Sequence, residues 1–309
     1  MQMKRVVHIF GNILMFVTLA YIVLQLWDNR LELKDSFNYT VLAATLFCTA
    51  VFTALVCFNP FLFSLILSAV TGKKQNYKKV APIYLKSNMY KYLPGNVMHY
   101  IGRNQLAVDT DLKHGEVAFS SLAEAMLSMT GAIIGGTLFA GKYMLDAVTT
   151  YINIKYVVYA FSFFVIIFFL IVAVFKSKVF ILFEKLKSII LSKNIYLFIA
   201  VLFCMIISLA LNGFIFAVVL ISMDVKLNLV QIIQVLGISM IAWLVGFVTP
   251  GSPGGLGIRE AMLSVLLSHI APISILAAAA VIYRCITIFG DILAYLVIKI
   301  LIKDNTKSL

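Results

Sequence analysis

The sequence predicts an all-α polytopic membrane protein with about eight transmembrane segments, two of which are broken by proline and glycine. Hydrophobic residues make up 62% of the 309 residues and charged residues only 12%, a balance that soluble domains do not have. Several apolar runs reach the roughly 20 residues that a helix needs to cross a bilayer. A pair of Pro-Gly breaks, each followed by an arginine, also occupies matching positions in the two halves of the chain.

The apolar runs set the expected spans. Those long enough to cross a bilayer are Val6–Trp27, Tyr39–Val70, Val117–Ala140, Tyr156–Phe175, Ile195–Ile221, Val230–Val248 and Ile273–Ile302. Two further segments fall short: Ile83–Ile101 is interrupted by Pro94, and Leu256–Ile270 has too few residues to cross without thinning the bilayer or tilting. We predict that these two segments are re-entrant. The alternative is a set of eight ordinary spans, with Leu256–Ile270 as a thin one.

These spans use almost the whole chain, so we predict one integral membrane domain over residues 1–309. The longest polar stretch, Thr71–Lys91, is too short to fold alone. No nucleophile elbow, Walker loop or metal-ligand spacing occurs in the sequence. We therefore expect no catalytic residues, no metal and no cofactor, which favours a non-enzymatic protein without excluding an enzyme.

The net charge of +12 is distributed unevenly. Lysines fill the second and fourth connections between spans and the two chain ends, whereas the first connection is mixed and the third and fifth are short and nearly neutral. By the positive-inside rule, both termini are predicted to be cytoplasmic. The lysines have no interleaved aromatic platform on a soluble face, so no nucleic-acid partner is expected.

The two breaks suggest a duplicated architecture. Pro94 and Pro250 are 156 positions apart, as are Arg103 and Arg259. By the positive-inside rule, the matching spans of the two halves are predicted to cross the membrane in opposite directions. Gly/Pro-interrupted segments in corresponding positions of two halves are typical of transporters built from inverted repeats. We predict half-repeats at roughly 1–145 and 146–309, with the second break turning a hairpin over Val230–Ile270.

Arginine is scarce, and three of the five arginines lie beside or inside apolar segments. A charge in such a position is costly and by default marks a pathway or a ligand, and guanidinium suits two-point recognition of phosphate. A helix starting near Leu256 would add an anion-binding N-terminus. The predicted substrate-binding residues are Arg103, Arg259, Arg284, Glu124, Glu260, Gly254, Gly255 and Gly257. The predicted broken-helix positions are Pro94, Gly95, Pro250, Gly251 and Pro253.

Structural alternatives remain for several of these residues. Arg103 could end a helix at the cytoplasmic interface. Arg284 could pair with Asp291, which lies seven residues later on nearly the same helix face. Glu124 either neutralises one of the arginines or acts as a proton-coupled switch.

These motifs resemble the lysylphosphatidylglycerol synthase transmembrane family, also called the flippase-like domain family. The resemblance rests on Leu93-Pro94-Gly95 with Gly102-Arg103, on Glu124, on the string from Pro253 to Glu260, and on Tyr283-Arg284. It implies a bacterial inner-membrane protein of about eight helices. The multidomain relatives flip aminoacylated phospholipids and carry an aminoacyl-transferase domain, which does not fit in this sequence. The segment Thr249-Pro250-Gly251-Ser252 adds a Pro-Gly pair before the family's string from Pro253 to Glu260. The resemblance therefore does not identify the substrate.

The sequence thus favours a translocase for a membrane phospholipid or a polyprenyl-phosphate-linked lipid, with its anionic phosphate headgroup held near the midplane. One alternative is a non-transporting subunit that presents a lipid acceptor to a separate partner transferase. A small-ion or metabolite carrier is the other, and the scarcity of intramembrane acids disfavours it. An oligomer is compatible with each of these functions.

Overall fold

The computed structural model describes residues 27, 38–92, 97–107, 112–151, 195–249 and 252–302. Within these ranges all regular structure is helical. The helices long and apolar enough to cross a membrane are α3 (Tyr39–Thr71), α6 (His114–Tyr151), α9 (Ile195–Ser222), α10 (Leu229–Val248) and α12 (Ile273–Leu301). The predicted fold class, an all-α polytopic membrane protein, is therefore confirmed.

The five long helices match predicted spans to within a few residues, except that α6 extends well beyond Val117–Ala140. The predicted span Tyr156–Phe175, and Val6–Trp27 apart from Trp27, lie outside the described residues. The count of about eight segments accordingly stays a prediction. Pro60 lies inside α3 without ending it, so the overlong run Tyr39–Val70 forms one helix.

Local signals at the helix ends explain several of these bounds. The side chain of Asn38 accepts a hydrogen bond from the Val41 amide at 3.1 Å and so caps α3. Gly72 ends α3 in the left-handed conformation. A reciprocal capping box between Asn228 and Gln231 starts α10.

Two shorter segments separate the long helices. The first contains α4 (Tyr77–Asn88), the 3-10 turn η1 (Met89–Tyr92) and α5 (Met98–Leu106). The second follows α10 and contains the 3-10 turn η2 (Pro253–Gly255) and α11 (Ile258–Leu266). The helices α4, α5 and α11 have 12, 9 and 9 residues, so none of the three can cross a bilayer that needs about 20.

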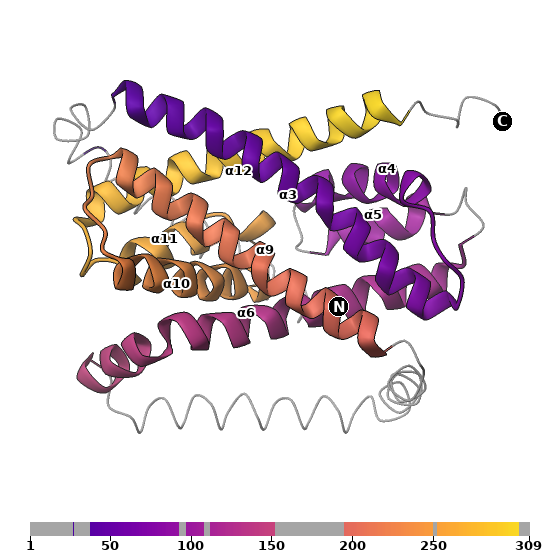
Figure 1. Ribbon diagram of the computed structural model, residues 1–309, viewed down its shortest axis with the longest axis horizontal. Helices are drawn as coiled ribbons and strands as arrows, with labels where there is room; N and C mark the ends of the chain where they lie inside the picture. The colour runs from indigo at the N-terminus through magenta and orange to yellow at the C-terminus, as the bar shows by residue number, and fades with distance from the viewer. Residues whose placement is uncertain are drawn as a thin grey trace, which may run out of the picture.

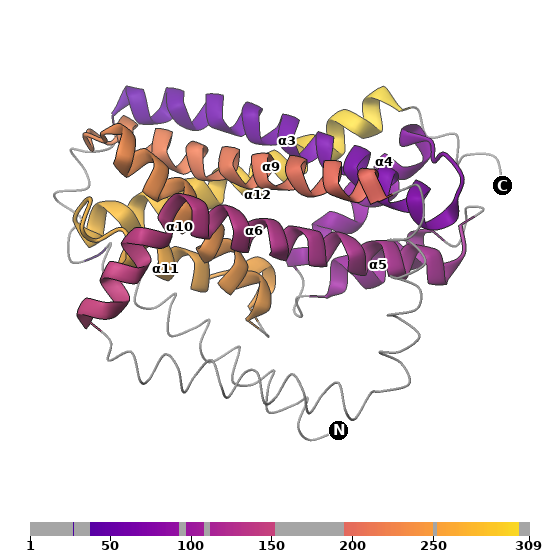
Figure 2. The same cartoon turned by 60° about the horizontal axis from the view of Figure 1, so that its bottom comes forward.

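The short segments form hairpins at opposite ends of the bundle. In Figures 1 and 2 the long helices run roughly along the long axis, with α4 and α5 at one end and α10 with α11 reaching in from the other. The 3-10 turns η1 and η2, which lie next to the two Pro-Gly breaks, contact one another. The residues Pro94, Gly95, Pro250 and Gly251 themselves lie outside the described residues.

The bundle is apolar both inside and on much of its surface. Its core includes fully buried side chains of α9, α10 and α12, among them Phe216, Ile238 and Ile286. Large apolar side chains such as Phe203 and Leu46 are 64% and 65% exposed. Outward-facing side chains of this kind suit a hydrocarbon solvent, in which exposure of apolar surface costs nothing.

Candidate functional site

A cavity of about 200 Å³ lies where the two hairpin tips meet. Its walls include Lys91 and Tyr92 of η1 and Gly254 of η2. The other described helices complete the walls with, among others, Asn59, Arg103, Glu124, Ser208, Trp243, Arg259, Arg284 and Asp291. Small-molecule sites typically hold about 300–1,000 Å³, so this cavity suits a small headgroup rather than an entire lipid.

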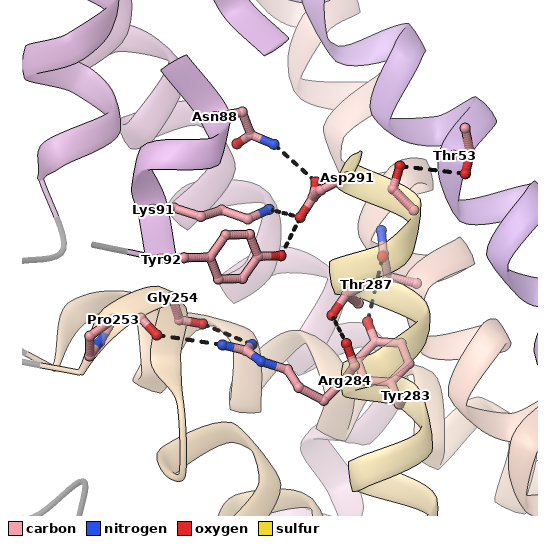
Figure 3. A network of polar contacts seen from close by, with 12 residues as sticks. Thr53, Asn88, Lys91, Tyr92, Pro253, Gly254, Tyr283, Arg284, Thr287 and Asp291 are labelled. Atoms are coloured by element: carbon pink, nitrogen blue, oxygen red, sulfur yellow. Dashed lines mark hydrogen bonds and ion pairs between the residues drawn. The ribbon is translucent and has the colours of Figure 1, made fainter. Parts of the chain in front are cut away.

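Asp291 of α12 holds the tip of the first hairpin. Its carboxylate is 1% exposed, pairs with the ammonium of Lys91 at 2.6 Å, and accepts hydrogen bonds from the Tyr92 hydroxyl and, at 3.0 Å, from the Asn88 amide. Figure 3 shows these three side chains converging on Asp291. A buried carboxylate with three partners is well satisfied, so these contacts tie η1 to α12.

Arg284, two helical turns earlier on α12, holds the tip of the second hairpin. Its guanidinium donates to the carbonyl oxygens of Gly254 at 3.1 Å and Pro253 at 3.4 Å (Figure 3). Its Nε also lies 3.7 Å from a carboxylate oxygen of Glu260. The ion pair between Arg284 and Asp291 that the sequence left open is therefore wrong: Asp291 pairs with Lys91.

The carbonyls that Arg284 binds point toward it because η2 has an unusual backbone. Gly254, Gly255 and Gly257 have φ values of +57°, +74° and +80°. Residues other than glycine rarely adopt this left-handed backbone conformation, so the three glycines permit the turn between α10 and α11. Of the three, Gly254 lines the cavity.

Arg103 and Glu124 form a buried pair on another wall. The guanidinium of Arg103 lies 2.5 Å from Glu124 Oε2, and the Tyr84 hydroxyl donates to Glu124 Oε1 at 2.6 Å. Arg103 is 1% exposed, and its guanidinium carbon lies 3.9 Å from the Tyr84 ring centroid and 4.5 Å from that of Phe63. Arg103 is thus buried in the protein and does not end its helix at an interface. Glu124 neutralises it, which is one of the two roles that the sequence left open.

Arg259 differs from the other three cations of the cavity. Within the described part of the chain its side chain makes no hydrogen bond and no ion pair, and its buried Nε has no partner. Its guanidinium carbon lies 5.7 Å from the Trp243 ring centroid. Lys91, Arg103 and Arg284 each have an acidic partner. Arg259 is therefore the cation of the cavity whose positive charge no described acid neutralises.

Two glycines fix the path of the Arg259 side chain. A Cβ atom added to Gly246 of α10 would lie 2.5 Å from Arg259 Cγ, and one added to Gly255 would lie 2.5 Å from Arg259 Nε. A Cβ atom is not found this close to a non-bonded heavy atom in real proteins. The stem of Arg259 therefore passes through a slot that only glycine on both sides leaves open, and its guanidinium is delivered to the cavity.

The structure brings most of the predicted site residues to one cavity. Arg103, Glu124, Gly254, Arg259 and Arg284 line it. Glu260 contacts it through Arg284, whereas Gly255, Gly257 and Pro253 shape the adjoining turn. Their role in binding substrate stays a prediction.

Sequence reasoning missed part of the cavity. The positive-inside rule accounts for Lys91 as one of the lysines in the second connection, but Lys91 also directly precedes the first break, and that position is the signal that could have found it. Asn59 and Ser208 also line the cavity. Asn59 and Ser208 could have been found as single polar residues inside long apolar spans, where such residues mark a pathway or ligand site.

The fold and the cavity define a multi-pass α-helical membrane protein with a charged cavity between two opposed hairpins. Residues 12–294 match the family described as Lysylphosphatidylglycerol synthase TM region, so the chain belongs to this family and the resemblance is confirmed. Family membership indicates a lipid-related role in the membrane. No curated protein and no solved structure matches the chain.

Proposed function

We propose that the protein is a lipid translocase that holds an anionic phosphate headgroup in the cavity between the hairpin tips. The observation that carries this proposal is Arg259, a cation that lines the cavity and has no acidic partner among the described residues. Arg259 is half-buried and its Nε is fully buried, so a charge there without a partner is costly, and a ligand phosphate would supply the missing negative charge. Guanidinium can bind two phosphate oxygens at once.

The lipid is a membrane phospholipid or a polyprenyl-phosphate-linked lipid. Its phosphate binds Arg259, and its hydrocarbon tails remain in the bilayer because a cavity of about 200 Å³ has no room for them. The headgroup reaches the opposite leaflet when one half of the protein rocks against the other. The role of Arg103 and Arg284 in this proposal is to hold the walls of the site, since both are already paired.

The order of the helices supports an inverted repeat with halves at roughly 1–145 and 146–309. In the first half, α3 is followed by the α4–α5 hairpin and α6; in the second, α9 is followed by the α10–α11 hairpin and α12. The corresponding helices α3 and α9 run in opposite directions along the bundle, as do α6 and α12 (Figure 1). Inversion of this kind gives a site that can face either side of a membrane in turn.

The lysines support an orientation for this repeat in a bacterial inner membrane. The end of the bundle that carries α4 has Lys73, Lys74, Lys78 and Lys79, whereas the turn between α9 and α10 at the other end has Asp224 and Lys226. The positive-inside rule assigns the lysine-rich end and both termini to the cytoplasm. We expect an impermeant maleimide added to intact cells to label Asp224→Cys and not Lys78→Cys. The reverse labelling pattern would refute this orientation.

We expect Arg259→Ala to slow lipid exchange about tenfold, because the substitution removes a charged hydrogen-bond donor to the phosphate. The measurement uses purified protein in vesicles that contain fluorescent phosphatidylglycerol, with dithionite added to bleach the outer leaflet. Lys86→Ala is the matched control, since it removes a positive charge from an exposed position outside the cavity. Gly246→Ala should slow exchange as well, because its methyl group would displace the Arg259 stem.

Exchange that is equally fast with and without Arg259 would contradict the proposal. Protein that retains lipid through purification but exchanges none, and that co-purifies with a transferase, would instead indicate a subunit that presents a lipid acceptor.

A further inference from the structure

Uncharged polar side chains on the long helices face the same cavity. Asn59 of α3, Ser128 of α6, and Ser208 with Asn212 of α9 all line it. The helices α3, α6 and α9 pack against one another, so these four side chains come from three neighbouring helices. The charged groups of the hairpin tips, Lys91 and Arg259, come from other elements. We call Asn59, Ser128, Ser208 and Asn212 the amide–hydroxyl face.

The amide–hydroxyl face has spare hydrogen-bonding capacity. Within the described part of the chain, the side chains of Asn59 and Ser208 make no hydrogen bond. Ser128 donates only to the sulfur of Met205, at 3.2 Å, and sulfur is a weak acceptor. Asn212 donates to the Ser208 carbonyl at 2.7 Å, but its side-chain oxygen meets the Tyr283 hydroxyl only at 3.5 Å, a length at which a hydrogen bond is weak.

Polar groups without partners are expensive in an apolar span, so such residues mark a pathway or ligand site by default. Amides and hydroxyls offer both donors and acceptors. The ligand group that matches such a mixture is another hydroxyl, which donates and accepts in turn. A quaternary ammonium group has no donor. A primary ammonium group would seek a carboxylate, and Glu124 and Asp291 are already paired.

We infer that the amide–hydroxyl face is a second subsite, which binds the hydroxyl groups of a polyol or sugar attached to the lipid phosphate. The inference rests on the proposed function, because Arg259 must hold the phosphate for the hydroxyls to reach this face. It narrows the substrate class to anionic lipids with a hydroxylated headgroup. Asn59 and Ser208, which have no side-chain hydrogen bond to any residue that the structure describes, determine this specificity.

Equilibrium binding in detergent tests this subsite without requiring transport. The protein has two tryptophans, and Trp243 lines the cavity, so in a Trp27→Phe background its fluorescence reports occupancy. The probes are dihexanoyl phosphatidylglycerol and dihexanoyl phosphatidylpropanol, which have the same charge and carbon skeleton but differ in the two hydroxyls. We expect phosphatidylglycerol to bind about tenfold more tightly, as two neutral hydrogen bonds predict.

The variants separate the two subsites. Ser208→Ala and Asn59→Leu, singly and together, should weaken the binding of phosphatidylglycerol and leave that of phosphatidylpropanol unchanged. The ratio of the two affinities should therefore fall toward 1. Arg259→Ala should weaken both lipids by the same factor. Thr53→Val is the matched control: Thr53 also lies on α3, but its hydroxyl donates to the Thr49 carbonyl at 2.7 Å and is outside the cavity lining. It should leave the preference unchanged.

The outcomes distinguish failure of the inference from failure of the proposed function. Equal affinity of the unsubstituted protein for the two lipids, with both dependent on Arg259, would overturn the amide–hydroxyl subsite and leave the anion site intact. Binding of neither lipid, or binding that ignores Arg259, would overturn both. A preference that persists in the double variant, which retains Ser128 and Asn212, would overturn the role given to Asn59 and Ser208. Phosphatidylinositol, as a third probe, identifies a ring-shaped polyol headgroup if it binds more tightly than phosphatidylglycerol and a glycerol headgroup if it binds less tightly. Either result, together with the preference over phosphatidylpropanol, supports the subsite.

Discussion

Replacing Glu124 by alanine is expected to destabilise the protein by about 3–5 kcal/mol, because the substitution leaves a buried arginine without its counter-charge. Arg103 is 1% exposed and pairs with Glu124 at 2.5 Å. The Tyr84 hydroxyl would lose its acceptor as well. The measurement is reversible unfolding in mixed detergent micelles, followed by circular dichroism.

The double variant Arg103→Met with Glu124→Gln separates charge from packing. Replacing a buried ion pair by groups of similar volume is often close to neutral, so the double variant should be more stable than Glu124→Ala although it carries more changes. Phe63 and Tyr84 flank Arg103 and would pack against a methionine at that position. If Glu124→Ala unfolds at the same detergent fraction as the unsubstituted protein, Glu124 does not neutralise Arg103.

The membrane-spanning helices could be predicted from the sequence because a span depends only on consecutive residues of one segment. A helix in a bilayer needs about 20 apolar residues in a row, and α9 and α10 begin and end within a residue of the predicted runs Ile195–Ile221 and Val230–Val248. The meeting of the hairpin tips η1 and η2 could be anticipated for a similar reason. Gly254 and Gly257 signal a backbone that no ordinary helix accepts, and such backbone must be shielded from lipid.

The partners of the charged residues could not be predicted in this way. Arg284 and Asp291 lie on nearly the same face of α12, but seven residues correspond to about 10.5 Å along a helix. Side chains on a helix also lean toward its N-terminus, so Arg284 points away from Asp291. Arg284 instead contacts η2, and Asp291 contacts η1. Both of these turns lie outside α12. Which tip comes close depends on how the helices pack, and a spacing along one chain does not contain that information.

Removing Asp291 is expected to release the first hairpin tip from the bundle. Asp291 is the common partner of Asn88, Lys91 and Tyr92, so Asp291→Ala breaks three contacts and leaves a cationic side chain unpaired. Breaking a buried pair costs about 3–5 kcal/mol. The lower figure applies because the Lys91 side chain is 27% exposed. At about 1.4 kcal/mol per tenfold, local opening should become roughly 100-fold more frequent.

Hydrogen–deuterium exchange of the peptide over residues 85–92 measures this opening, with the peptide over residues 205–215 of α9 as the internal reference. Asp291→Asn should open the tip less than Asp291→Ala, since an amide oxygen still accepts from Tyr92 and Asn88. Lys91→Met combined with Asp291→Asn should recover further protection, because it removes the unpaired charge. Lipid exchange should fall in Asp291→Ala in parallel, since a detached η1 no longer forms a wall of the cavity. Unchanged protection of residues 85–92 in Asp291→Ala would mean that α12 does not hold the first hairpin in place.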